Sequence, residues 1–173
     1  MARNIEIKAR VADIASVEPL AAALADQGPF EIDQDDTFFA CPNGRLKLRV
    51  LAENDGQLIF YRRADSAGPK ESFYVISATS EPDTLRETLA LAYGPAGRVR
   101  KRRTLYLAGR TRIHLDRVEG LGEFLELEVV LAEGEALETG LAEAHGLMAR
   151  LGVEPGQLLE GAYVDLLAGE KNG

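Results

Sequence analysis

The stretch Asn4-Ile5-Glu6-Ile7-Lys8 alternates polar and aliphatic residues one by one, which is the two-residue period of a β-strand. Residues i and i+2 of a strand lie on one face, so Asn4, Glu6 and Lys8 share a face and the two isoleucines share the other. The same alternation recurs in four further stretches, at residues 45–49, 58–63, 98–103 and 126–129. The chain therefore predicts several strands that each have a charged face and a mostly apolar face.

Two interpretations of the charged faces follow from the alternation alone. In a sheet that is covered on one side, the polar face ordinarily meets water. In a closed barrel with the charged faces inward, acidic rows would hold a metal ion and basic rows would hold a polyanion. Such a barrel would be a metal-assisted phosphate site.

Length and composition describe one ordinary globular domain, spanning residues 1–173. Hydrophobic residues make up 46% of the chain and charged residues 28%, which is too apolar for a disordered protein. The net charge is -8 and the pI is near 4.9. An acidic chain of this kind is not expected to bind nucleic acid or a membrane surface through its overall charge.

Cysteine and histidine usage narrows the metal chemistry. The single cysteine, Cys41, offers neither an internal disulfide nor a thiolate cluster, which fits a reducing compartment. No leader-like apolar run precedes the first strand, and no stretch has the length of a membrane span, so we expect a cytoplasmic protein. Neither His114 nor His145 lies in a metal-ligand spacing, and the sequence predicts a site without imidazole.

The order of elements indicates an α+β fold with an antiparallel sheet. A first helix, capped by Asp13 or Ser16 with Pro19 in its first turn, is expected to end at Gly28. Two strands in 30–50 are joined through the Asn43-Gly44 turn, and further strands are expected at 58–63, 73–78, 98–108, 112–118 and 123–131. Helices are expected at 83–93 and 135–151, with a short helix or irregular arm at 158–167. About eight strands with helices between runs of strands favour this class over a parallel sheet.

The acidic candidates are Glu6 on the first strand and the pair Glu126 and Glu128, which share a face of the last strand. Mg²⁺ and Mn²⁺ prefer carboxylate, water and phosphate oxygens, so carboxylates from separate strands would suit them. The alternative is a solvated face whose ion pairs contribute about 0–1 kcal/mol each.

The basic candidates fall on three other strands. Arg45, Lys47 and Arg49 form one row, and Arg62 follows an aromatic pair. Within 98–103 the two-residue period separates Lys101 and Arg103 from the other arginines, so only one set points inward. The chain has no glycine-rich phosphate loop, and any phosphate must be held by side chains.

The order of these motifs resembles that of the CYTH, or triphosphate tunnel, superfamily. The stretch Asn4-Ile5-Glu6-Ile7-Lys8 is similar to its Glu-x-Glu-x-Lys signature, with asparagine in place of the first glutamate. The segment 115–128, LDRVEGLGEFLELE, resembles a segment of the class IV adenylyl cyclase branch. The strand 44–49, the Tyr61-Arg62 pair, the run 99–103 and the terminal 163–167 are also similar and occur in the family's order.

The resemblance implies a closed eight-stranded antiparallel β-barrel with flanking helices, whose charged interior binds a triphosphate with Mg²⁺ or Mn²⁺. Carried over to this sequence, it implies the metal ligands Glu6, Asp116, Glu126 and Glu128. It implies substrate contacts from Lys8, Lys47, Arg49, Arg62, Lys101 and Arg103. The residues expected to carry catalysis are Glu6, Lys8, Lys101 and Glu126.

The resemblance implies a metal-dependent enzyme that processes triphosphates. The leading hypothesis is conversion of ATP to cyclic AMP and pyrophosphate. The alternatives are hydrolysis of tripolyphosphate or thiamine triphosphate in the same tunnel, or a non-catalytic module that binds nucleotide or polyphosphate. The expected partner is a nucleoside triphosphate or an inorganic polyphosphate. Apolar helix faces would also allow a homodimer, which nothing in the sequence specifies.

Overall fold

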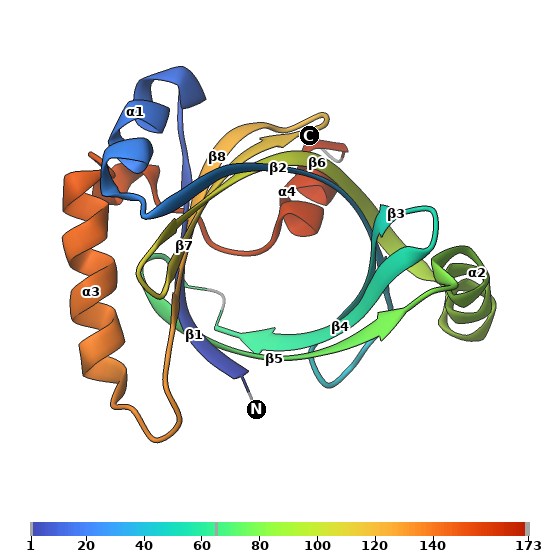
Figure 1. Cartoon of the computed structure of the whole chain (residues 1–173). Coiled ribbons are helices and arrows are strands. Elements are labelled where there is room, and N and C mark those ends of the chain that lie inside the picture. Colours follow the sequence, from blue (N-terminus) through green and yellow to red (C-terminus); the bar gives the residue numbers. More distant parts are fainter. Residues whose placement is uncertain (1, 65, 172–173) are drawn as a thin grey trace.

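The structure is a computed structural model that describes residues 2–64 and 66–171. Eight antiparallel strands close into a barrel in the order β1-β5-β4-β3-β2-β6-β7-β8, which Figure 1 views along its axis. The strands are β1 (Ala2–Arg10), β2 (Gln27–Phe39), β3 (Arg45–Ala52), β4 (Asp55–Arg63), β5 (Lys70–Thr79), β6 (Pro95–Ala108), β7 (Thr111–Val118) and β8 (Gly122–Val130). The predicted fold class and the closed barrel are confirmed.

The apolar faces of the alternating strands β1 and β8 point out of the barrel, and their charged faces point into it. Ile5 and Ile7 of β1 are 1% exposed and pack outside the barrel with aliphatic residues of β7 and β8, while Glu6 and Lys8 point into it. Two helices cover this outer surface, α1 (Ile14–Leu24) and α3 (Leu137–Arg150), both at the left of Figure 1. The core of the protein therefore lies between the barrel wall and its helices, and the barrel interior remains polar.

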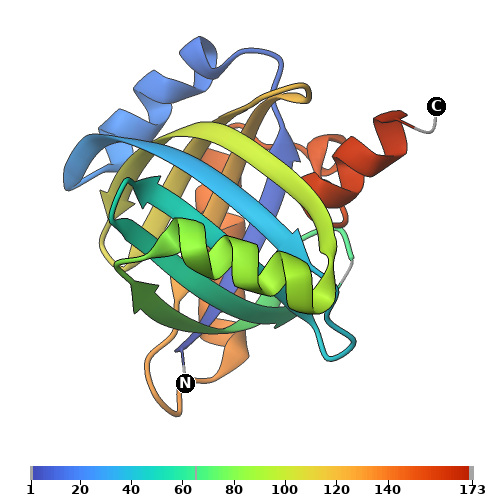
Figure 2. The same cartoon turned by 90° about the vertical axis from the view of Figure 1, so that its right-hand side faces the viewer.

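Two further helices contact the rest of the barrel. The helix α2 (Pro82–Tyr93) lies across the outside of β2, β3 and β4, as Figure 2 shows. The helix α4 (Tyr163–Lys171) follows a short 3₁₀ turn, Pro155–Gln157, and lies at one end of the barrel. No helix in the described part of the chain is long and apolar enough to cross a membrane.

Close approaches at two glycines set the positions of α3 and α4. A Cβ at Gly140 of α3 would lie 2.8 Å from the Ile5 side chain, so this glycine lets the helix approach β1. Gly97 of β6 has φ +140°, and a Cβ there would overlap Val164 of α4. Val164 and Tyr163 thus reach the barrel end, where they pack with Phe38, Val99 and other buried residues.

The predicted elements differ from the observed ones mainly at their ends. Asp13 caps α1, accepting a hydrogen bond from the Ala15 amide at 3.0 Å. The helix ends at Leu24 rather than at Gly28, because the segment from Gln27 already pairs with β6. Pro19 lies inside the helix, beyond its first turn, because the helix begins at Ile14. The final arm, expected at 158–167, is helical only from Tyr163.

Candidate functional site: a charged tunnel through the barrel

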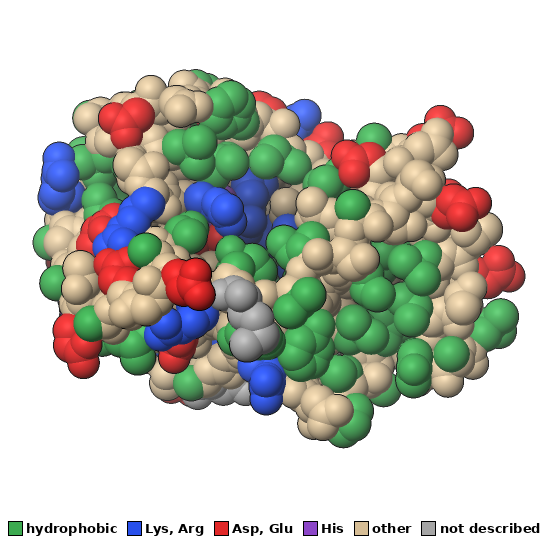
Figure 3. Space-filling view, turned by 60° about the horizontal axis from the view of Figure 1, so that its bottom comes forward, with side chains coloured by type: hydrophobic (Ala, Val, Ile, Leu, Met, Phe, Trp, Pro, Cys, Tyr) green, Lys and Arg blue, Asp and Glu red, His purple; other side chains and the backbone are tan. Residues whose placement is uncertain are grey.

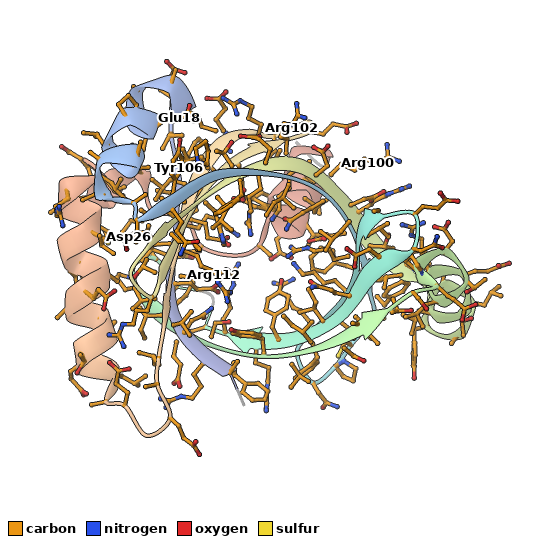
Figure 4. The ribbon with its side chains drawn as sticks, in the orientation of Figure 1. Glu18, Asp26, Arg100, Arg102, Tyr106 and Arg112 are labelled. Carbon is orange, nitrogen blue, oxygen red and sulfur yellow. The ribbon has the colours of Figure 1, made fainter. Side chains whose placement is uncertain are left out.

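The barrel encloses a cavity of about 370 Å³, and its lining has more basic than acidic side chains although the protein as a whole is acidic. Its lining contains seven basic side chains and four acidic ones, against a net charge of -8 for the whole chain. Figure 3 shows blue Lys and Arg side chains set back in a hollow of the surface, and Figure 4 shows side chains filling the barrel, with Arg112 among them. The basic residues have gathered where a polyanion would enter.

One part of the wall, formed by β7, β8 and β1, is acidic. Register across these strands places Glu128 between Glu6 and Arg112, and places Glu126 between Lys8 and His114. This brings together Glu6, Glu126 and Glu128, as the sequence predicted, together with Lys8. β7 and β8 form a hairpin, but β1 meets β8 only through barrel closure, so no local motif encodes the whole group.

Glu6 and Glu128 are direct cross-strand neighbours of like charge, an arrangement that destabilises a sheet unless a cation offsets it. Burial raises the pKa of Glu6; Arg63, which donates to Glu6 Oε1 at 2.9 Å, opposes that effect, while Glu126 and Glu128 reinforce it. Asn4, 3% exposed on the same face, has a side-chain oxygen without a hydrogen-bond partner in the described structure. Arg63 thus offsets only part of the repulsion between Glu6 and Glu128.

Glu126 has the most contacts of the three carboxylates. Its Oε2 lies 3.6 Å from Lys8 Nζ, while its Oε1 lies 3.3 Å from Arg103 Nη2 and 3.4 Å from His114 Nδ1. Burial alone would raise the pKa of Glu126, but Lys8, the His114 hydrogen bond and Arg103 together hold it well below its usual range. The Glu126 carboxylate is thus ionised and available to a cation.

His114 is a member of this wall that the sequence analysis set aside. Its ring is 3% exposed and faces the cavity, and Nδ1 lies 3.9 Å from Glu128 Oε1. Ligand atoms of His114, Glu126 and Glu128 all lie within 4.8 Å of one another. His114 lies in no metal-ligand spacing along the chain because its partners come from the adjacent strand.

The opposite part of the wall, formed by β3, β2 and β6, is basic. Arg49 donates two hydrogen bonds of 2.8 Å to Asp36, and Lys47 donates one of 2.9 Å. The neighbouring cations keep the pKa of Asp36 below its usual range despite burial, and burial lowers the pKa of Lys47. Asp36, which the sequence analysis did not single out, is the counter-ion that orients this part of the wall.

Asp116 has the same role on the next strands. Arg103 donates two hydrogen bonds of 2.7 Å to it, the Tyr163 hydroxyl donates another at 2.8 Å, and Lys101 Nζ lies 3.6 Å away. Asp116 is fully buried and does not line the cavity. Both of its oxygens are engaged, and Arg103 Nη2 bridges it to Glu126; its role as a metal ligand stays a prediction.

Two of the three lysines that line the tunnel have pKa values lowered toward neutrality. Burial lowers the pKa of Lys8 to about 8. Burial and the nearby Arg103 charge lower the pKa of Lys101 to about 7. Both ammonium groups lie over the Tyr163 ring, 4.0 Å and 4.8 Å from its centroid. An incoming polyanion would favour the charged form of each lysine.

The third part of the wall, formed by β4 and β5, carries apolar and aromatic side chains together with Gln57, Arg63 and Ser72. Ile59 pairs with Ile76 and Tyr61 pairs with Tyr74, and all four side chains line the cavity. The tunnel thus has an acidic, a basic and an apolar side in order around the barrel.

Arg62 is not in the tunnel, and Arg63 is. Arg62 is exposed on the outer face of β4, where its guanidinium lies over the rings of Phe60 and Phe73 at 5.8 Å and 5.4 Å. Arg63 faces inward, donating to Glu6 and to the Gly161 carbonyl. Arg62 instead lines an outer basin that shares Tyr61 and Arg63 with the tunnel.

The other predicted site residues do face the cavity: Glu6, Lys8, Lys47, Arg49, Lys101, Arg103, Glu126 and Glu128. The arginines that alternate with Lys101 and Arg103 point outward, and Figure 4 shows Arg100 and Arg102 there. They pair with acidic residues of the outer surface, Arg98 and Arg100 with Asp35 and Arg102 with Asp33. Outer and inner charges of β6 are therefore neutralised separately.

The residues of the acidic wall fit a divalent metal ion. Glu6, Glu126, Glu128 and the unpaired amide oxygen of Asn4 supply the oxygen donors that Mg²⁺ and Mn²⁺ prefer. A cation there would also remove the repulsion between Glu6 and Glu128.

These features define a class of protein: a closed barrel whose interior carries acidic and basic walls facing one another, suited to a polyanion together with a cation. The CYTH domain model matches residues 2–163. The chain belongs to the CYTH domain family, whose enzymes are metal-dependent and include adenylate cyclases and triphosphatases.

Individual relatives are distant but cover nearly the whole chain. The adenylate cyclase CyaB of Aeromonas hydrophila is 25% identical over 167 residues, which are 92% of this chain and 86% of CyaB. A protein from Pyrococcus horikoshii superposes with a TM-score of 0.84 at 24% identity, over 95% of this chain and 99% of its own. An adenylyl cyclase candidate from Hippeastrum with a dominant triphosphatase activity gives 0.68 at 16% identity, over 98% and 96%. The structural neighbours support the barrel fold.

Proposed function

We propose that this protein is a metal-dependent enzyme that binds a nucleoside triphosphate in its tunnel and converts ATP to cyclic AMP and pyrophosphate. The observation that carries the proposal is the division of the tunnel into acidic, basic and apolar walls. Each wall suits a different part of one ligand: the metal ion, the phosphate chain and the nucleoside. The distant match to CyaB supports the same reaction.

The charge of the lining supports a triphosphate. Seven basic and four acidic side chains leave an excess of three positive charges when all are ionised. A bound divalent cation would raise this excess to about five, close to the roughly four negative charges of a nucleoside triphosphate. A monophosphate would leave most of this charge uncompensated.

The apolar wall favours a nucleoside over an inorganic chain. Tyr61 and Tyr74 offer ring faces and Ile59 and Ile76 offer aliphatic surface, none of which a bare tripolyphosphate would contact favourably. A base and a ribose would bury apolar area against them, which stabilises binding by about 25 cal/mol per Å². These residues therefore support a nucleotide over an inorganic substrate.

The reaction joins the ribose 3′-oxygen to the α-phosphorus, with the 3′-hydroxyl proton passing to water. It breaks the bond from that phosphorus to the bridging oxygen, and the pyrophosphate leaves with the electron pair of that bond. Arg49, Lys47 and Arg103 bind and orient the phosphate oxygens, and their own positions are set by Asp36 and Asp116. A bound divalent metal would supply Lewis-acid stabilisation of charge on the phosphates. Lys101, with its lowered pKa, takes up a proton as the anion binds.

The test is product identification with purified protein. ATP, tripolyphosphate and thiamine triphosphate are each incubated with Mg²⁺ or Mn²⁺, and the products are separated and identified. We expect cyclic AMP and pyrophosphate from ATP, at a higher rate than phosphate release from the other two substrates. Without added metal, or with a chelator, turnover should be lost.

Other results would favour the alternatives. Phosphate release from tripolyphosphate or thiamine triphosphate that exceeds cyclic AMP formation would make the protein a triphosphatase, as the Hippeastrum relative's dominant activity illustrates. Binding of metal and triphosphate without any turnover would make it a binding module. In either case, thermal stabilisation by ATP should exceed that by AMP, reaching about 2.7 kcal/mol at 100 times the dissociation constant.

A further inference from the structure

We propose that His114 is a nitrogen ligand of the tunnel's metal ion, so that the site selects Mn²⁺ or another borderline transition ion over Mg²⁺. The inference rests on the proposed function, because it assigns a ligand to the metal that the function requires. It concerns the side of the cavity where His114, Glu126 and Glu128 meet.

The geometry places a ring nitrogen among the carboxylate oxygens. His114 Nδ1 lies 3.4 Å from Glu126 Oε1 and 3.9 Å from Glu128 Oε1. A metal ion with bonds of about 2.1 Å separates neighbouring ligand atoms by about 3 Å and opposite ones by about 4 Å. One ion can therefore lie against all three side chains after small rotations of the carboxylates.

A second observation independently points to a ligand in the same cavity, on its β1 side. Asn4 is 3% exposed, lies on the cavity wall, and its oxygen has no hydrogen-bond donor in the described structure. A buried acceptor without a partner costs about 1–3 kcal/mol, so its persistence indicates a group that the protein alone does not provide. Glu6, the next residue on the same face of β1, pairs with Glu128, so this side of the cavity adjoins the triad of β7 and β8.

The chemistry of the donors predicts which ion is preferred. Mg²⁺ binds oxygen almost exclusively, whereas imidazole is a good ligand for borderline transition ions, and Mn²⁺ accepts both. Asn4 replaces a charged carboxylate with a neutral oxygen, which weakens a purely ionic Mg²⁺ site more than one that gains an imidazole bond. Both changes shift preference toward a transition ion.

His114 could instead act only by positioning Glu126, to which its Nδ1 is hydrogen-bonded. Loss of a positioning partner also lowers metal affinity, commonly about 10–100-fold. Affinity by itself thus does not separate the two roles. Direct detection of nitrogen on the metal does.

The experiment measures electron spin echo envelope modulation of Mn²⁺ bound to the full chain with inorganic tripolyphosphate, which carries no nitrogen. Protein labelled with ¹⁵N only at histidine is compared with unlabelled protein. The chain has two histidines, and His145 is exposed on α3, outside the barrel. The variant His145→Gln therefore keeps His114 as its sole imidazole, and His114→Gln is the matched substitution in the tunnel.

We expect the nitrogen modulation to change with histidine labelling in the wild type and in His145→Gln, and to vanish in His114→Gln. Calorimetric titration should show the preference for Mn²⁺ over Mg²⁺ falling about tenfold or more in His114→Gln and unchanged in His145→Gln.

Mn²⁺ bound without histidine modulation in the wild type would overturn the inference while leaving the proposed function intact. No Mn²⁺ or Mg²⁺ binding, with or without tripolyphosphate, would overturn both. If His114→Gln does not fold, the labelled His145→Gln protein still decides the assignment, because its modulation arises only from His114.

Discussion

The acidic and basic walls of the tunnel both consist of buried charges, but the charges are compensated in different ways. On the basic wall, Asp36 and Asp116 each accept two hydrogen bonds of 2.7–2.8 Å from one arginine. On the acidic wall, Glu128 has a single arginine contact at 3.4 Å, and its direct neighbour is Glu6. Each aspartate of the basic wall is thus held by a bidentate arginine, whereas the contacts of the three glutamates with cations among the described residues are single.

This difference indicates what each wall does before and after a ligand arrives. Bidentate pairs fix the guanidinium planes in advance, so a phosphate chain meets donors that need little reordering. Apart from the 2.9 Å bond from Arg63 to Glu6, the contacts on the acidic wall are 3.3 Å or longer, so a metal ion can displace them at small cost. The basic wall thus suits a phosphate chain that must be oriented, and the acidic wall suits a metal ion that replaces existing contacts.

Removing a counter-ion of the basic wall should have the largest effect. Asp36→Asn leaves Lys47 and Arg49 without their buried counter-ion. We expect a loss of about 3 kcal/mol in the free energy of unfolding, at the low end of the range for broken buried pairs because water enters the tunnel. Urea denaturation measures it.

The adjacent Asp35→Asn is the matched control. Asp35 faces outward on the same strand and pairs with exposed Arg98, so its loss should cost no more than about 1 kcal/mol. Tripolyphosphate should stabilise Asp36→Asn more than the wild type, since the anion replaces the missing charge. Equal destabilisation by the two variants would contradict the view of Asp36 as this counter-ion.

On the acidic wall, Glu126→Gln should abolish metal-dependent turnover without unfolding the protein. The amide keeps the volume but removes the charge that a hard cation needs. We expect at least a 100-fold loss of rate, since even outer partners of a metal site cost about 10–100-fold. Circular dichroism checks the fold. Glu133→Gln, at an exposed turn after β8, is the control, and wild-type rates for Glu126→Gln would rule out this ligand.

Two neighbouring arginines test which side of the wall binds phosphate. Arg63→Met removes an inward guanidinium and should weaken ATP binding about tenfold or more, the usual scale for a charged hydrogen bond. Arg62→Met removes an exposed guanidinium that lies over Phe60 and Phe73, and should change binding less than about twofold. Calorimetric titration of both variants measures this. A larger loss in Arg62→Met would place the phosphate site outside the tunnel.

The smallest predicted effect is a pH dependence from Lys101. Its pKa of about 7 means that the free protein loses this positive charge as pH rises, so tripolyphosphate affinity should fall several-fold between pH 7 and 9, with proton uptake on binding. The same depressed pKa makes the folded protein bind fewer protons than the unfolded chain, whose Lys101 titrates near 10.5. Stability from this group therefore rises with pH between about 7 and 10.5.

The variant Lys101→Arg isolates this contribution, because arginine stays charged throughout that range. We expect a flatter affinity profile and less proton uptake at pH 8, measured by calorimetry in buffers of different ionisation enthalpy. An unchanged profile would mean that another group titrates.

The alternation of residues predicted most of the strands and which residues of each strand share a face. The period of two places Asn4, Glu6 and Lys8 on one face, and it separates Lys101 and Arg103 from Arg100, because side chains of a strand can only alternate. The resemblance to the CYTH family then chose which face is inside. For β4 the sequence predicted Arg62 on the inner face, whereas the structure has Arg63 there. An error of one residue along a strand moves a side chain to the opposite face.

Only the tertiary structure decided which charges meet. His114 reaches Glu126 through the pairing of β7 with β8, and Glu6 reaches Glu128 through the pairing of β1 with β8, which are far apart in the sequence. Asp36 and Asp116 became counter-ions because the strands beside them carry arginine at the matching register. A sequence specifies the face of each residue through local geometry, whereas its partner across the barrel depends on register and closure.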